Sequence, residues 1–195
     1  MIRIKNILCF GDSLTAGYGL PSSQAYPALI QQRIQVNRFP YLVINAGVNG
    51  DTSATGVQRI EDYLAEPIDV LLLELGINDL FRGIYPDQTT QNLQRIINRV
   101  REVNPTCRLV VAGMELPSSI TSSFLASTFL SSSLIAAFRH LFEEIASRNG
   151  AAYIPFLLKG VAGHPRLNQR DGIHPTAEGQ QLIANNVWDV LSAVL

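Results

Sequence analysis

Short apolar runs rich in valine, isoleucine and leucine alternate along the chain with longer amphipathic segments. Such runs are typical of parallel strands that are covered on both faces, and the segments between them are typical of the covering helices. The pattern predicts five strands, over residues 4–10, 41–46, 69–75, 108–113 and 152–155. It predicts helices over residues 26–36, 55–64, 88–103, 134–149 and 177–195. The sequence therefore predicts one α/β domain, residues 1–195, built on a five-stranded parallel sheet.

Helix-breaking residues support these limits. Pro67 follows the second predicted helix, Asn104 and Pro105 follow the third, and Gly150 stands where a glycine commonly ends a helix. No internal repeat and no linker divides the chain.

One segment, residues 116–138, carries no charged side chain and is dense in serine and threonine. These hydroxyl groups make a transmembrane span a poor interpretation. Two interpretations stay open: a helix that covers the core, or, over residues 114–129, the wall of an apolar substrate pocket beyond a strand end.

Composition excludes some classes of partner. The 195 residues include 15 Lys and Arg and 16 Asp and Glu, for a net charge of −1, and no basic run stands out. Nucleic acid is therefore not an expected partner. Cys9 and Cys107 lie in apolar strand-like segments, so we expect free structural cysteines. The first residues lack the apolar region of a signal peptide, which favours a cytoplasmic protein, or a periplasmic or secreted one if a signal was removed.

Candidate chemistry gathers where strands end. Ser13 follows the first strand, residues 45–53 follow the second and residues 76–79 follow the third, while Asp171 and His174 lie three residues apart in one loop. Each segment alone is explained by ordinary turn and cap chemistry. The carboxyl ends of parallel strands meet at one edge, however, so these side chains are expected to converge. The Asp–His spacing also lets a carboxylate orient an imidazole.

Four of these segments resemble the sequence blocks of the SGNH, or GDSL, hydrolase family. Residues 11–14 (GDSL) match the first block, Gly50 the second, residues 76–79 (GIND) the third and residues 171–175 (DGIHP) the fifth. Within the family the similarity is greatest to the small bacterial arylesterase/acyl-CoA thioesterase I (lysophospholipase L1-like) subgroup. The resemblance implies a flavodoxin-like three-layer α/β/α sandwich and a carboxylic ester hydrolase.

The resemblance also implies roles for five residues. Ser13 would be the nucleophile, His174 the general base and Asp171 the acid that orients the base. The backbone N–H groups of Ser13 and Gly50, with the side-chain amide of Asn78, would form the oxyanion hole. A serine hydroxyl attacks well only when a base takes its proton, and donors already in place stabilise the developing negative charge. This acyl transfer requires no metal and no cofactor.

The segments beside these blocks suggest the substrate. We expect Leu80 and Phe81, and the pair Leu116 and Pro117 that borders the acyl pocket in the subgroup, to contact it. The implied substrates are small-molecule aryl or short-to-medium acyl esters, acyl thioesters and lysophospholipids. Two alternatives remain: a carbohydrate O-deacetylase that uses the same triad, and a non-catalytic binding module.

The remaining polar residues near the blocks receive structural interpretations. Asp12, Asp51 and Asp79 are expected to be loop and cap residues. His140 and His164 lack a carboxylate at triad spacing and are expected on the surface, and no His/Cys cluster has the spacing of metal ligands.

Overall fold

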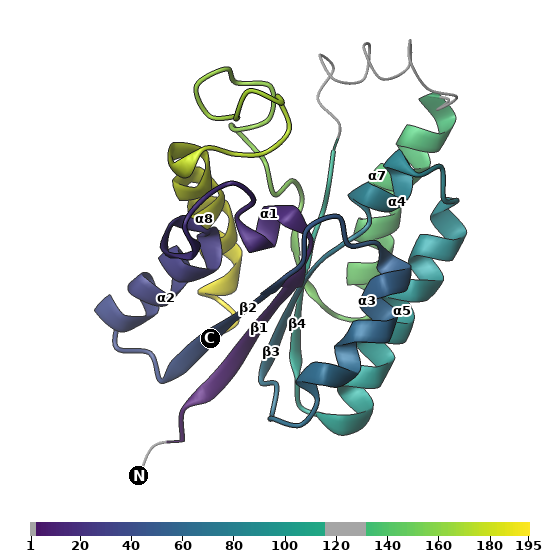
Figure 1. Ribbon diagram of the computed structural model, residues 1–195. Helices are drawn as coiled ribbons and strands as arrows, with labels where there is room; N and C mark the ends of the chain where they lie inside the picture. The colour runs from purple at the N-terminus through teal and green to yellow at the C-terminus, as the bar shows by residue number, and fades with distance from the viewer. Residues whose placement is uncertain (1–2, 116–131) are drawn as a thin grey trace.

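A five-stranded parallel sheet runs through the centre of the protein (Figure 1). The computed structural model describes residues 3–115 and 132–195. The strands are β1 (Lys5–Gly11), β2 (Tyr41–Gly47), β3 (Val70–Glu74), β4 (Arg108–Ala112) and β5 (Ala152–Ile154). Their order in the sheet is β2-β1-β3-β4-β5, with every pair parallel. This is the flavodoxin-like order, so the expected fold class is confirmed.

Helices cover both faces of the sheet (Figure 1). On one face α2 (Tyr26–Val36) packs against α8 (Ala177–Leu191). On the other face α5 (Pro86–Val103) packs between α3 (Ser53–Arg59) and α7 (Ser132–Arg148). Four short elements complete the described part of the chain: α1 (Ser13–Ala16), α4 (Ile77–Phe81) and the 3₁₀ helices η1 (Ser22–Gln24) and η2 (Ile60–Tyr63).

Several helix limits differ from the predicted ones. α5 and α7 each begin two residues earlier than predicted, and α8 ends at Leu191 and not at residue 195. The segment predicted as a helix over residues 55–64 begins two residues earlier, because Thr52 caps it in a capping box with Thr55. It then tightens into η2 at Ile60. Strand limits shift by one residue, within the usual uncertainty of element ends.

The core lies on both sides of the central strands. Residues 7–10 of β1 and residues 70–72 of β3 are completely buried, which explains their unbroken apolar sequence. Each fully buried aliphatic side chain contributes roughly 1.5–3 kcal/mol relative to its exposed state. Cys9 and Cys107 are buried and free, as expected. Burial raises the pKa of the Cys9 thiol to about 12 and that of Cys107 to about 11, so both stay protonated.

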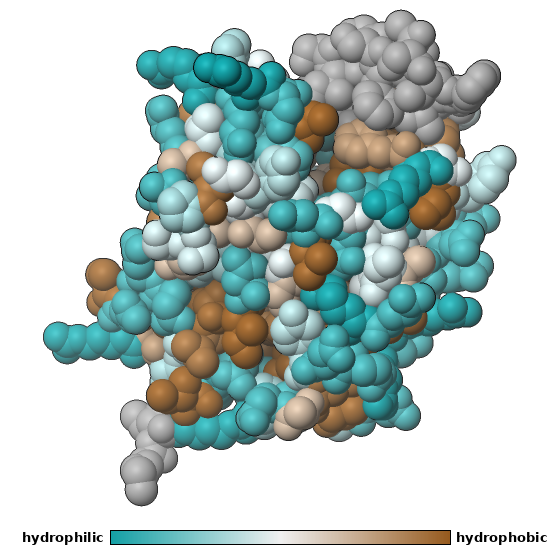
Figure 2. Space-filling view, in the orientation of Figure 1, coloured by the Kyte–Doolittle hydropathy of each residue, from teal (hydrophilic) through white to brown (hydrophobic). Residues whose placement is uncertain are grey.

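The outer edge of β2 carries exposed apolar side chains. Figure 2 shows apolar residues gathered over the region that α2 and β2 occupy in Figure 1, and Val36 and Leu42 are among the exposed large hydrophobic residues. The side chain of Gln31 caps this edge by accepting a 2.7 Å hydrogen bond from the N–H of Val43. A capped edge offers fewer free backbone groups to another strand. Within the described residues, no helix has both the length and the apolar character to span a membrane.

The end of β2 forms a tight seat for α1. Gly47 is the last residue of β2, and a Cβ atom there would lie 2.7 Å from the Cα atom of Ala16 and 2.7 Å from the carbonyl carbon of Thr15. These are backbone atoms, so neither can move aside alone. Only glycine at position 47 lets α1 lie this close to the sheet.

We therefore expect Gly47→Ala to displace α1 and to destabilise the protein by roughly 1–3 kcal/mol, the usual cost of overpacking. Urea denaturation measures the change in the free energy of unfolding. Val48→Ala, a truncation of the exposed neighbouring side chain, should stay within about 0.5 kcal/mol of the original protein. Equal stability of the Gly47→Ala variant and the original protein would show that α1 is not held by this contact.

Candidate active site

Ser13 stands at the start of α1, directly beyond the end of β1. Asp12 caps the helix, its Oδ1 accepting a 3.0 Å hydrogen bond from the N–H of Leu14. A Cβ atom at Gly11 would lie 2.5 Å from Glu74 Oε2, so this turn tolerates only glycine. The turn thus places the half-buried Ser13 at the edge of the sheet.

The loop that contains Asp171 and His174 brings an imidazole to Ser13. His174 Nδ1 lies 2.7 Å from Asp171 Oδ2, and His174 Nε2 lies 3.1 Å from Ser13 Oγ. The other carboxylate oxygen, Asp171 Oδ1, accepts from the N–H groups of Ile173 (2.9 Å) and His174 (3.0 Å). The loop therefore folds around the carboxylate and fixes the direction of the imidazole.

These contacts also keep Asp171 ionised. Partial burial opposes ionisation, but the hydrogen bonds from the His174 ring and from the two backbone N–H groups outweigh it and lower the pKa of Asp171. A carboxylate that accepts from Nδ1 leaves Nε2 without a proton in the neutral ring, and Nε2 is the atom that faces Ser13.

Two further residues hold this loop. The side-chain amide nitrogen of Gln169 donates to the carbonyl oxygens of Tyr18 (2.7 Å) and Pro175 (3.0 Å). The Tyr18 ring packs on the His174 ring, with centroids 4.3 Å apart and planes inclined by 35°. Neither the Gln169–Tyr18 contact nor the Tyr18–His174 contact has a periodic signal in the sequence, because the partners lie far apart along the chain.

Besides Ser13, the predicted oxyanion-hole residues are Asn78, in the first turn of α4, and Gly50, in the loop after β2. Asn78 Nδ2 donates to Asp12 Oδ2 at 3.0 Å and to the carbonyl oxygen of Asp51 at 2.9 Å. Gly50 has a φ of 75°, a left-handed conformation that favours glycine, and its carbonyl oxygen accepts from Arg82 Nη2 at 2.8 Å. Asn78 therefore connects the loop after β2 to the turn after β1.

A cleft of about 160 Å³ opens beside Ser13, Asn78 and His174. Most other residues that line it are apolar, including Leu14, Ile77, Phe81, Met114, Leu158, Ala162 and Ile173. Phe81 is among the residues that line this cleft, so it stays a predicted substrate contact.

The structure corrects the expectation for Leu80. Its side chain is only 2% exposed and lines a separate small cavity behind α4 with Phe138 and Phe142, not the cleft. Successive residues of a helix point about 100° apart, so Leu80 and Phe81 cannot share one face. The predicted contacts Leu116 and Pro117 lie outside the described residues, as does most of the segment 116–138.

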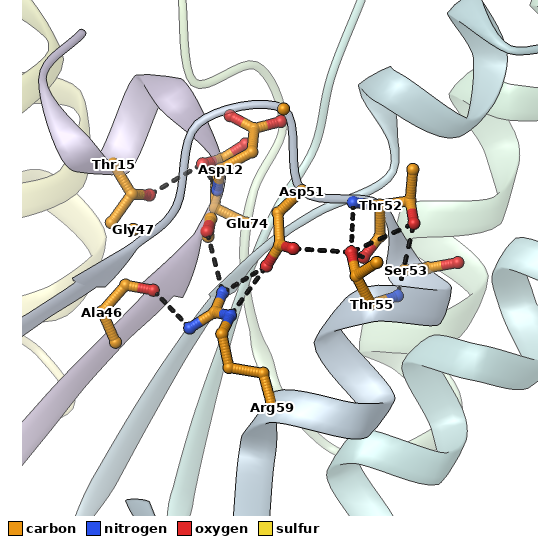
Figure 3. A network of polar contacts seen from close by, with 12 residues as sticks. Asp12, Thr15, Ala46, Gly47, Asp51, Thr52, Ser53, Thr55, Arg59 and Glu74 are labelled. Atoms are coloured by element: carbon orange, nitrogen blue, oxygen red, sulfur yellow. Dashed lines mark hydrogen bonds and ion pairs between the residues drawn. The ribbon is translucent and has the colours of Figure 1, made fainter. Parts of the chain in front are cut away.

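Behind the cleft the loops are joined by a buried ion pair (Figure 3). Arg59 Nε and Nη2 donate to Asp51 Oδ2 at 2.8 and 2.5 Å. The same guanidinium donates to the carbonyl oxygens of Ala46 (2.8 Å) and Gly11 (3.1 Å). One side chain of α3 therefore ties together the ends of β1 and β2 and the loop that carries Gly50.

A second buried carboxylate, Asp79, joins the helices on this side. It accepts from the N–H (2.8 Å) and the hydroxyl of Ser53, and from the hydroxyl of Thr89 at 3.1 Å. Asp12, Asp51 and Asp79 were expected to be loop and cap residues. Asp12 is indeed a cap, but all three are buried and connect elements distant in sequence.

Glu74 is a buried residue to which the sequence assigned no role. It ends β3 and is completely buried, and its Oε2 accepts from the Thr15 hydroxyl at 2.7 Å and from the N–H of Asp12 at 3.2 Å. The Tyr26 hydroxyl lies 2.9 Å from the same Thr15 hydroxyl. A charged residue at the end of an apolar run is a signal that could have identified it.

The other histidines lie apart from this site. His140 and His164 are exposed, as expected. Among residues 3–115 and 132–195, no group of three or more His, Cys, Asp or Glu side chains is arranged to hold a metal ion.

Comparisons with known proteins agree with this geometry. The model of the GDSL-like Lipase/Acylhydrolase family matches residues 9–182. The chain is 35% identical over 192 residues to "Esterase TesA" of Pseudomonas aeruginosa, with 98% of this chain and 90% of the relative covered. It is 33% identical over 180 residues to "Thioesterase 1/protease 1/lysophospholipase L1" of Escherichia coli, with coverage of 92% and 79%. A crystal structure of TesA superposes with a TM-score of 0.87 at 34% identity, covering 98% of this chain and all of that one (100%).

The chain therefore belongs to the GDSL-like lipase/acylhydrolase family. The resemblance drawn from the four sequence blocks is confirmed, and so is the expected class of serine esterase/thioesterase.

The Asp51–Arg59 pair is largely buried, so its loss should lower the stability of the protein strongly. We expect Arg59→Met to lower the free energy of unfolding by about 3–5 kcal/mol, because it leaves the Asp51 charge buried and unpaired. The double variant Asp51→Asn/Arg59→Met should recover part of this loss. Urea denaturation measures both.

Arg99→Met is the matched control, because Arg99 pairs with Glu61 and Glu102 on the surface. Exposed pairs contribute at most about 1 kcal/mol. A loss in Arg59→Met no larger than that in Arg99→Met would contradict a structural role for the buried pair.

Proposed function

We propose that the protein hydrolyses carboxylic esters and acyl thioesters through an acyl-enzyme formed on Ser13. The observation that carries this proposal is the continuous chain of contacts from Asp171 through His174 to Ser13, which ends in an open cleft. A nucleophile, a base and an orienting acid in this order are the three parts that serine hydrolysis needs.

The reaction proceeds in two steps. His174 Nε2 accepts the Ser13 proton while Ser13 Oγ attacks the carbonyl carbon, and the alcohol or thiol then leaves with that proton. Water then enters, and its oxygen attacks the acyl carbon while His174 takes one of its protons. The bond to Ser13 Oγ breaks, His174 returns the proton to Oγ, and the acid is released. Asp171, held ionised by its hydrogen bonds, stabilises the imidazolium formed in each step.

The oxyanion hole consists, in this proposal, of the N–H groups of Ser13 and Gly50 and the amide of Asn78. The first N–H groups of a helix have no acceptor within the helix, which leaves Ser13 N–H available. Both hydrogens of the Asn78 amide already meet acceptors, Asp12 Oδ2 and the Asp51 carbonyl oxygen. The substrate oxygen therefore has to share one of these hydrogens as its charge develops.

The lining of the cleft favours substrates with acyl or aryl groups. Its lining is largely apolar, which favours a hydrocarbon chain over a sugar, whose hydroxyls would need polar partners. Relatives named esterase and thioesterase 1/lysophospholipase L1 fit the same substrate class. A panel of p-nitrophenyl esters, acyl-CoAs and acetylated sugars tests this choice, and turnover confined to the sugars would replace it with a carbohydrate deacetylase.

The triad roles predict large losses of turnover. Ser13→Ala, His174→Ala and Asp171→Asn should each lower kcat for p-nitrophenyl butyrate by about 10⁴-fold, because triad members act as a unit. A fluorophosphonate should label the original protein at Ser13 and leave Ser13→Ala unlabelled.

Thermal denaturation controls for folding in these variants. High activity in His174→Ala would refute the assigned base. A folded original protein with no turnover of any activated ester and no label would instead identify a non-catalytic binding module.

Phe81 should affect binding of the substrate more than the chemical step, since it lines the cleft but is none of the residues proposed to take part in the reaction. We expect Phe81→Ala to raise KM for aryl and medium-chain acyl esters about tenfold, equivalent to about 1.4 kcal/mol, with little change in kcat. Tyr85→Ala removes an aromatic ring that is 74% exposed and should leave KM unchanged. Equal KM values for all three proteins would place the acyl group elsewhere.

A further inference from the structure

Two completely buried carboxyl groups, those of Asp12 and Glu74, lie together behind Asn78. Glu74 Oε2 accepts from the N–H of Asp12 at 3.2 Å, and the two side chains are within hydrogen-bond reach of each other. Among the described residues no Lys, Arg or His side chain pairs with either carboxyl. The nearby guanidinium of Arg59 donates to Asp51 and to two backbone carbonyls instead.

Two negative charges in this position would repel each other with no paired cation in the described part of the chain to offset the repulsion. Repulsion between unit charges is strong inside a protein, so buried carboxyl pairs usually share a proton. Glu74 Oε1 is buried without a hydrogen-bond partner. Such an atom is unsatisfied as an ionised oxygen but becomes a donor when it carries a proton.

We propose that the pair holds one proton and that the singly charged pair positions the Asn78 amide for catalysis. The proton is on Glu74, whose carboxylic acid donates a hydrogen bond to the Asp12 carboxylate. The inference rests on the proposed role of Asn78 in the oxyanion hole. Asp12 Oδ2 accepts from Asn78 Nδ2 at 3.0 Å, so the charge on Asp12 orients the amide directly. Glu74 acts through Asp12, and both are positioning residues.

The charge of the pair matters because negative charge develops on the substrate oxygen next to Asn78. A pair with a charge of −1 still accepts from the amide, whereas a pair with a charge of −2 would oppose the oxyanion more strongly. Burial raises the pKa of both carboxyls, and the negative charge of Asp12 raises that of Glu74 further. The proton is therefore retained at neutral pH and lost only at higher pH.

The groups around the pair agree with this charge state. Asp51 and Asp79, on the loop after β2 and on α4, add negative charge and further oppose a second ionisation. Tyr26 lies near both Glu74 and Cys9, and burial raises the pKa of Tyr26 and of Cys9, so both are neutral. Arg59 is the facing cation, and it neutralises Asp51.

Glu74→Gln is the decisive variant, because glutamine reproduces a protonated glutamate. Its amide oxygen can accept from Thr15 and from the Asp12 N–H, and its nitrogen can donate to Asp12. We expect kcat of Glu74→Gln within about threefold of the original protein at neutral pH. In the original protein, ionisation of the pair at alkaline pH should lower kcat. This decline should be absent in Glu74→Gln.

Glu74→Leu has similar volume but no donor and no acceptor, so the Asn78 amide loses its fixed direction. We expect kcat to fall about tenfold to 100-fold with KM nearly unchanged, part of the loss that follows complete removal of an oxyanion donor. Glu66→Gln, which removes an exposed carboxyl by the same chemistry, is the control and should match the original protein throughout. If Glu74→Leu fails to fold, the dependence of kcat on alkaline pH in Glu74→Gln still tests the proposal.

Two measurements report the proton without catalysis. Infrared difference spectra should show the carbonyl stretch of a protonated carboxylic acid in the original protein and not in Glu74→Gln. A carboxyl with a raised pKa in the folded state binds more protons there than in the unfolded state, so the free energy of unfolding falls as pH rises above the usual glutamate range. This fall should be shallower in Glu74→Gln.

These readouts separate the two proposals. An original protein with the infrared band but without ester turnover would refute the proposed function and leave the shared proton standing. If the original protein is active, two results would refute the shared proton: Glu74→Gln as impaired as Glu74→Leu, or an infrared band that persists in Glu74→Gln.

Discussion

Strand β1 pairs in parallel with both β2 and β3, and Gly11 is the last residue to pair in both registers. Its partners are Gly47 on one side and Glu74 on the other. Because the three strands point the same way, the segments that follow them leave the sheet at one edge. Ser13 and Asn78 start from neighbouring points, and only short turns are needed to bring them to one cleft. The candidate site depends on this register more than on any single loop.

The site divides its charged groups between two environments. Asp171 and His174 lie near the cleft opening, where a proton can be passed to and from substrate and water. Asp51 and Asp79 are buried, and each accepts several hydrogen bonds from other elements. Partners of a buried charge cannot be replaced by water, so these carboxylates fix the positions of the loops. In the proposed mechanism, the acid that orients the imidazole is thus different from the acids that position the loops.

The sequence predicted the parts of this arrangement that have local signals. Each strand is an apolar run, and Asp171 and His174 are close enough along the chain to suggest their contact. Glu74 and Arg59 were missed, because side-chain hydrogen bonds leave no periodic pattern in the sequence. Thr15, a partner of Glu74, lies 59 residues away, and even Asp51, the ion-pair partner of Arg59, lies eight residues away without a helical period that marks it. Helices α1 and α4 contain four and five residues, too few for a helical period to appear. That shortness also explains why Leu80 was placed in the cleft.

The four residues of the GDSL block each satisfy a different requirement of the same turn. Gly11 lets the carboxyl that ends β3 pass beneath the chain, where a side chain would collide with it. Asp12 caps α1 through one oxygen and holds Asn78 through the other. Ser13 presents its hydroxyl to the imidazole, and Leu14 contributes to both the core and the cleft wall. A larger residue at the first position would move the other three together. The block therefore acts as one structural unit, in which adjacent residues hold the proposed nucleophile, Ser13, and the proposed oxyanion donor, Asn78.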